Sequence, residues 1–76
     1  DLTECAAKIE GVLQVHDLRA RHSGSQIFVE VHIVVDPDMT VRQGHDISRD
    51  VKHSLLDCFA DVTRVIVHID PDLQSD

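Results

Sequence analysis

The sequence has no tryptophan and no tyrosine, and Phe28 and Phe59 are its only phenylalanines. A hydrophobic core in this chain must therefore be built from Val, Ile, Leu and Ala. With 76 residues, the chain is near the lower size at which one core stabilises a domain by itself. Thin cores of this kind often gain stability from a partner subunit or a bound metal, so we expect self-association.

Positive charge is also scarce. Seven lysines and arginines stand against fourteen acidic residues, and the net charge is -7 with the histidines neutral. Binding to DNA or RNA requires clustered Lys and Arg, whereas the densest basic stretch here is the short run RARH at 19–22. The composition argues against a nucleic-acid partner. An acidic chain with six histidines suits cations better.

Long hydrophobic runs are missing as well. No run approaches the roughly 20 apolar residues of a membrane-spanning helix, and no signal peptide opens the chain. Because the first residue is Asp1 and not Met, we expect a fragment or a processed chain, with residues 1–76 forming one domain. Cys5 and Cys58 are far apart, in no CxxC spacing, and fall on apolar helix faces. We expect both to be reduced and buried.

Hydrophobic spacing predicts two helices and three strands. Apolar residues at helical spacing precede Gly11, which is expected to end the first helix. Thr40 and Gln43 form a capping-box pattern at the start of a second helix, from about Val41 to Phe59. The expected strands are 12–22 and 26–36, joined by a hairpin turn at the sequence SGS, and 62–70.

Alternation assigns faces to two of these strands. In 26–36 the odd-numbered residues are all apolar, so they face the core, and His32 points to the opposite side. In the last strand Val65, Val67 and Ile69 face inward, while His68 and Asp70 face outward. The order helix, strand, strand, helix, strand predicts an α+β, ferredoxin-like αββαβ fold, a three-stranded sheet with two helices on one face. The uncovered face carries His32, His68 and Asp70.

Each of these polar residues alone is most simply a solvated strand residue. Their coincidence on one face suggests a metal site, because imidazole and carboxylate are ligands of first-row metals. His16 is a further candidate, although the mixed alternation of its strand leaves its facing open. His45 lies in the first turns of the second helix, and His22 and His53 are expected to face solvent. A catalytic His–Asp pair would need a nucleophile in a motif such as GxSxG, which this sequence lacks, so we do not expect an enzyme.

Four stretches together carry a resemblance to a known family. GVLQVHDLRARHSG, IFVEVHIVVD, GHDIS and VIVHIDP resemble the cytoplasmic C-terminal domain of cation diffusion facilitator (CDF) transporters, from about Gly11 to Pro71. The stretch DPDMTVRQGHDIS further resembles magnetosome members of the family, of the MamB type. The resemblance implies a metallochaperone-like regulatory domain below a transmembrane domain that this chain does not contain. Such a domain would lie in the cytoplasm, at a bacterial inner or magnetosome membrane.

The resemblance also implies a mechanism and a ligand set. Divalent cations would bind between the arms of a V-shaped homodimer, close it and promote efflux. The expected cation is a divalent transition metal, zinc or iron first, with manganese, cadmium or nickel as further candidates. A paralogous transporter is a further expected partner. Ile69 departs from the family pattern, which often has glutamine there. The implied metal ligands are His16, His32, His45, His68 and Asp70.

Other functions remain open at this point. The runner-up is a structural dimerisation module whose histidines bind no metal. A soluble metal carrier of this shape would be expected to use paired cysteines for copper, and none are present. A small ligand-binding α+β domain is a further alternative.

Overall fold

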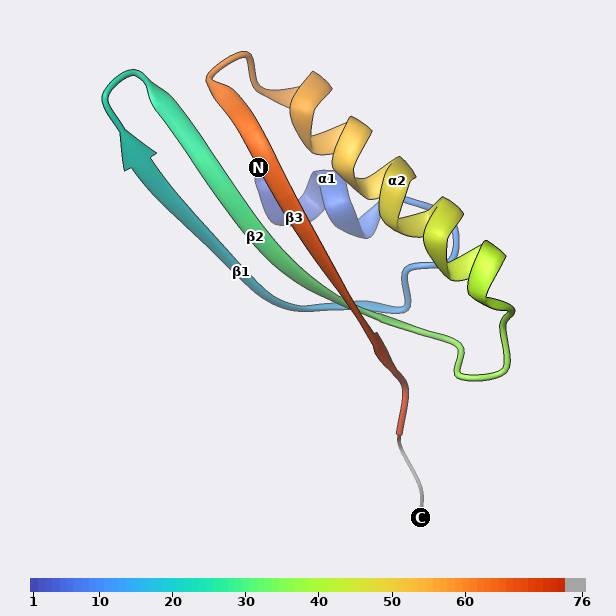
Figure 1. Ribbon diagram of the computed structural model, residues 1–76. Coiled ribbons are helices and arrows are strands. Elements are labelled where there is room, and N and C mark those ends of the chain that lie inside the picture. Colours follow the sequence, from blue (N-terminus) through green and yellow to red (C-terminus); the bar gives the residue numbers. More distant parts are fainter. Residues whose placement is uncertain (74–76) are drawn as a thin grey trace.

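A three-stranded sheet covered on one face by two helices makes up the fold (Figure 1). The computed structural model describes residues 1–73, so the last three residues of the predicted domain lie outside the described range. The fold is α+β and ferredoxin-like, as predicted. Its elements are α1 (Leu2–Ala7), β1 (Gln14–Ser23), β2 (Gln26–Val35), α2 (Val41–Cys58) and β3 (Val62–Pro71).

The strands lie in the order β1-β2-β3, with β2 in the centre. β1 and β2 are antiparallel and joined by a tight turn in which Gly24 has a positive φ of 63°. β2 and β3 are parallel, and α2 forms the crossover between them. A parallel pair needs such a long connection because its two strands begin at the same edge of the sheet. In this register His32 is the partner of His68.

The core lies between the sheet and the helices. The odd-numbered residues of β2 from Val29 to Val35 are at most 3% exposed, which confirms the predicted inner face. They pack against one stripe of α2, formed by Ile47, Val51 and Leu55. The buried cluster consists of aliphatic residues only, namely Ala6, Val29, Val31, Ile33, Val35, Ile47, Val51, Leu55, Val62 and Val65.

Both helix ends differ from the prediction. α1 ends at Ala7, and Lys8 keeps a right-handed conformation, so Gly11 does not cap the helix. Gly11 has a φ of 98° in the following turn, and a Cβ atom there would lie 2.5 Å from Cδ1 of Ile47. α2 ends at Cys58, and Phe59 is extended and 39% exposed. The fourfold spacing that placed Phe59 on the buried stripe of α2 continues past the end of the helix.

The predicted capping box at the start of α2 is confirmed. The Gln43 backbone N–H donates to Oγ1 of Thr40 at 3.0 Å, and the Thr40 N–H donates to Oε1 of Gln43 at 2.9 Å. These bonds satisfy donors that the first helical turn leaves without backbone partners. No helix within residues 1–73 has the length and apolar character needed to span a bilayer.

The two cysteines correct a prediction. Cys5 and Cys58 are joined in a disulfide, although we expected both to be reduced and buried. Cys5 is half-buried and Cys58 is exposed. Packing of α1 against α2 brings together two residues that lie 53 positions apart in the sequence. Sequence spacing gave no indication of this pairing, because the two helices are neighbours only in the folded chain.

Candidate metal centre

The face of the sheet opposite the helices carries a pair of histidines at its centre. His32 on β2 and His68 on β3 are register partners in the parallel pair, so their side chains project side by side. Their rings are stacked, with centroids 4.4 Å apart and planes inclined by 10°. The predicted placement of both histidines on the outer face is therefore confirmed.

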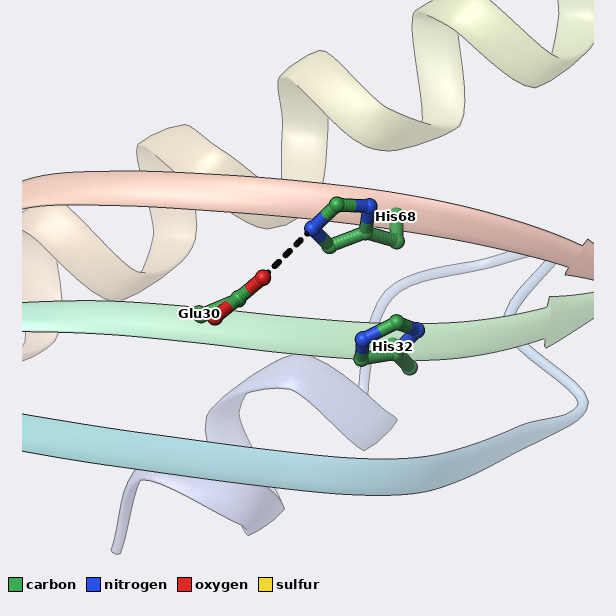
Figure 2. A group of neighbouring side chains, drawn as sticks. All are labelled: Glu30, His32 and His68. Atoms are coloured by element: carbon green, nitrogen blue, oxygen red, sulfur yellow. Dashed lines mark hydrogen bonds and ion pairs between the residues drawn. The ribbon is translucent and has the colours of Figure 1, made fainter.

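Each imidazole contacts a carboxylate from the neighbouring strand. Nε2 of His68 lies 2.7 Å from Oε2 of Glu30, a contact drawn as the dashed line in Figure 2. Nδ1 of His32 lies 3.4 Å from Oδ2 of Asp70. The carboxylates thus pair across the strands, one on each side of the histidine row.

Three of these residues form a compact set of potential ligands. One ligand atom each from Glu30, His32 and His68 lies within 4.8 Å of the others. Asp70 extends the group through its contact with His32. The four side chains are between 34% and 48% exposed, so a cation reaches them without any opening of the core. Two imidazole nitrogens and a carboxylate oxygen are ligands that zinc and other first-row metals accept in proteins.

Two of the five predicted ligands lie elsewhere in the chain. His16 is exposed and occupies an irregularity in β1 between Val15 and Asp17, so that Asp17, and not His16, is the register partner of His32. His45 is on α2, in the helix layer. There it lines a hollow with Asp36 and Ile69 at the other face of the sheet. Within one chain, neither residue joins the histidine pair.

Sequence reasoning missed Glu30 as a candidate ligand. The alternation of β2 did place Glu30 on the same face as His32, two residues away. That spacing was a usable signal, whereas the ligand set implied by the family resemblance contains four histidines and Asp70 but not Glu30. Ile69 faces the helix layer, where its Cδ1 would be 3.8 Å from a Cβ at position 44, and it offers the metal cluster no polar group.

Comparison with protein families gives a match over almost the whole chain. Residues 1–72 match the model of the cation efflux protein, cytoplasmic domain. This is a family of transporter domains and not of enzymes, as the missing nucleophile suggested.

Several characterised proteins are similar in sequence. Metal tolerance protein C1 of Arabidopsis thaliana is 39% identical over 84% of this chain and 14% of its own length. Manganese efflux system protein MneP of Bacillus subtilis (strain 168) is 35% identical over 79% of this chain and 20% of its own length. Cation-efflux pump FieF of Yersinia pestis (strain Pestoides F) is 36% identical over 80% of this chain and 20% of its own length. The chain therefore spans a fifth or less of the length of these three relatives.

Solved structures of the MamM CTD have the same fold. A nickel form of one variant has a TM-score of 0.89 at 31% identity, covering 92% of this chain and 89% of that one. A cadmium form of another variant has a TM-score of 0.89 at 33% identity, covering 92% and 88%. MamM is a magnetosome transporter, which agrees with the predicted resemblance of residues 36–48 to magnetosome members of the family. The likeness to the MamB type stays a prediction. The predicted resemblance is confirmed: this chain belongs to the cation efflux protein family and corresponds to its cytoplasmic domain.

Proposed function

We propose that this domain binds a divalent transition-metal cation on its outer sheet face and thereby controls how two protomers pair in a cation efflux transporter. The observation that carries the proposal is the stacked pair of His32 and His68, each in contact with a carboxylate of the other strand. Zinc and iron are the first candidates. Manganese, cadmium and nickel are supported by the names of the relatives and neighbours, MneP and the cadmium and nickel forms of the MamM CTD.

The charge of the cluster favours a cation. Glu30 and Asp70 bring two negative charges to a site whose imidazoles must be neutral to act as ligands. The chain as a whole has a net charge of -7, so a cation meets little repulsion on approach. Two carboxylates beside two neutral imidazoles would bind a divalent ion more strongly than a single carboxylate at a strand end, because both negative charges attract the ion.

The coordination leaves room for a second protomer. Glu30, His32 and His68 supply three ligands, whereas a closed zinc site has four. The outer face is not covered by the helices, so another copy can approach it (Figure 1). His45 lies on the helix side of the sheet, so it would take part in metal binding only through a second protomer or at a separate site. His16, in the exposed irregularity of β1, is the other predicted ligand that pairing could bring in.

Cation binding between protomers would close a V-shaped homodimer. Two protomers that each carry a net charge of -7 repel each other until a cation neutralises carboxylates between them, so the closed arrangement would bind metal better than the open one. A tenfold difference in affinity supplies about 1.4 kcal/mol toward closure, and two symmetric sites supply about twice that. Promotion of divalent-cation efflux by the full transporter is the proposed consequence.

Metal titration of this chain tests the proposal. Calorimetry should show zinc binding to the wild type. The Glu30→Gln variant, which keeps the shape of the side chain, should bind more weakly. Small-angle scattering should show compaction of the wild-type dimer on adding metal. His53→Ala is the matched control, because His53 is exposed on α2, away from the cluster. Equal binding by Glu30→Gln, His68→Ala and the wild type would contradict the assignment of the site.

A metal-independent dimerisation module is the second candidate. Its support is apolar surface on the outer face, where Ile66 is 44% exposed beside half-buried Phe28. This function predicts a dimer whose sedimentation and melting temperature do not change when metal is removed by a chelating resin. A metal-dependent shift in either quantity contradicts it.

A further inference from the structure

A second site lies on the outer face, beside the metal cluster and toward the hairpin end of the sheet. It is a hollow of about 590 Å³. Besides Ala20 and Val29, its lining residues are Arg19, Arg21, Phe28, Glu30, Arg64 and Ile66.

Strand register builds this hollow. Phe28 on the central strand β2 has Arg21 of β1 as its partner on one side and Arg64 of β3 on the other. In the next outward-facing row, Glu30 stands between Arg19 and Ile66. Phe28 is therefore flanked by Arg21 and Arg64 on the neighbouring strands. The next row places Arg19 and Ile66 on either side of Glu30.

The charge in the hollow opposes that of the chain. Three of the seven lysines and arginines line it, but only one of the fourteen acidic residues does. Arg19 is bonded to Asp17, with Nε 3.2 Å from Oδ2. Within residues 1–73, Arg21 and Arg64 have no ion pair. The Glu30 carboxylate is engaged by His68 at 2.7 Å. Two guanidinium groups are therefore left without a counter-charge in an acidic protein.

We propose that this hollow binds a small oxyanion that carries two or more phosphate or carboxylate groups. A guanidinium group presents paired N–H donors that match the oxygens of phosphate and carboxylate, so Arg21 and Arg64 can hold one charged group each. Phe28 and Ile66 offer an apolar surface for the body of an organic anion. Three arginines on a chain of net charge -7 are too few for nucleic acid, whose affinity depends on many phosphate contacts.

Anion titration of the metal-free chain tests this site separately from the metal site. The chain is passed over a chelating resin, and sodium pyrophosphate and sodium citrate are added in turn while amide NMR spectra are recorded. Saturable chemical-shift changes at residues 19–21, 28–30 and 64–66 support the proposal. Tighter binding of pyrophosphate indicates a preference for phosphate groups, and tighter binding of citrate a preference for carboxylate groups. Shifts spread evenly over the chain, or none with either probe, overturn it.

Charge-matched variants sharpen the test. The double variant Arg21→Gln/Arg64→Gln should bind about tenfold more weakly or worse, because two charge-assisted contacts are lost. Arg42→Gln/Arg49→Gln removes the same charge from α2 and should bind like the wild type. Glu30→Gln should bind anions more tightly, because it removes the one carboxylate that lines the hollow. Equal weakening by both double variants would mean non-specific attraction. Binding to anionic lipid vesicles without binding either small anion would also overturn the proposal.

Discussion

The inner and outer faces of the same sheet follow opposite rules. On β2 the inner residues Val29, Val31 and Ile33 are at most 2% exposed and belong to the buried aliphatic cluster. One position along, Phe28, Glu30 and His32 are half-buried or exposed and form the outer face with ionic and aromatic neighbours. We therefore expect stability to depend on the odd-numbered positions of this strand, and the proposed binding on the even-numbered ones. A change on one face should leave the property of the other nearly unaltered.

Removing inner-face volume should have the largest effect on stability. Ile33→Ala deletes a side chain that is 0% exposed and should lower the free energy of unfolding by about 4 kcal/mol, because a cavity remains in the aliphatic core. His32→Ala, its outer neighbour, should cost less than about 1 kcal/mol. Urea unfolding followed by circular dichroism measures both. Similar losses in the two variants would refute the division between the faces.

Breaking the disulfide tests the helix layer that covers the inner face. Cys5→Ser opens a bridge across 53 positions and should destabilise the chain by about 3 kcal/mol, since the unfolded state is no longer constrained. Added dithiothreitol should reproduce this loss in the wild type and have no further effect on the variant. The outer-face metal affinity should stay the same. Thermal unfolding with and without reductant gives the answer, and an unchanged melting temperature would contradict the role of the bridge.

His68→Ala should have the opposite effect, weakening metal binding while leaving the stability of the metal-free chain nearly unchanged. It removes one imidazole from the cluster and should weaken metal binding by about 2 kcal/mol, some thirtyfold, because a lost ligand is replaced only by water. Unfolding of the metal-free chain should change little, since His68 is 43% exposed. Calorimetric titration and urea unfolding of the same variant separate the two effects. A large loss of metal-free stability would show that the stacked pair serves the fold instead.

Threonine substitutions at two adjacent positions give the smallest and sharpest test. Val65→Thr puts a hydroxyl into an inner position that is 6% exposed and should cost about 1–2 kcal/mol, because the hydroxyl loses its water partners. Ile66→Thr, on the outer face at 44% exposure, should stay within about 0.5 kcal/mol of the wild type. Both variants need only a melting curve. An equal cost at 65 and 66 would indicate that another surface covers the outer face.

Alternation made much of this architecture predictable from the sequence. The apolar odd positions of β2 fixed its inner face, and the same rule put His32, His68 and Asp70 together on the other side. The capping box located the start of α2 because its hydrogen bonds are local. These features depend on residues near one another in the sequence, which is why they could be read directly.

Features set by contacts between distant segments were not predictable. The irregularity beside Val15 moves His16 out of line with His32; the mixed alternation of this strand left its facing open but did not locate the irregularity. The Cys5–Cys58 bridge depends on how α1 packs against α2. The contact between Glu30 and His68 needs the register of a parallel pair, which the sequence of either strand alone does not contain.

The parallel register of β2 and β3 has a consequence for insertions and deletions. The loops before and after α2, at 36–40 and 59–61, can change length while His32 and His68 stay opposite each other. A single residue inserted between Arg64 and His68 would instead turn His68 toward the core and expose its neighbours, because strand side chains alternate. The turn at Gly11 is also constrained, since it lies close to Ile47. In alignments of related domains, gaps should therefore fall in the loops that flank α2 and spare the strand residues that build the two proposed outer-face sites.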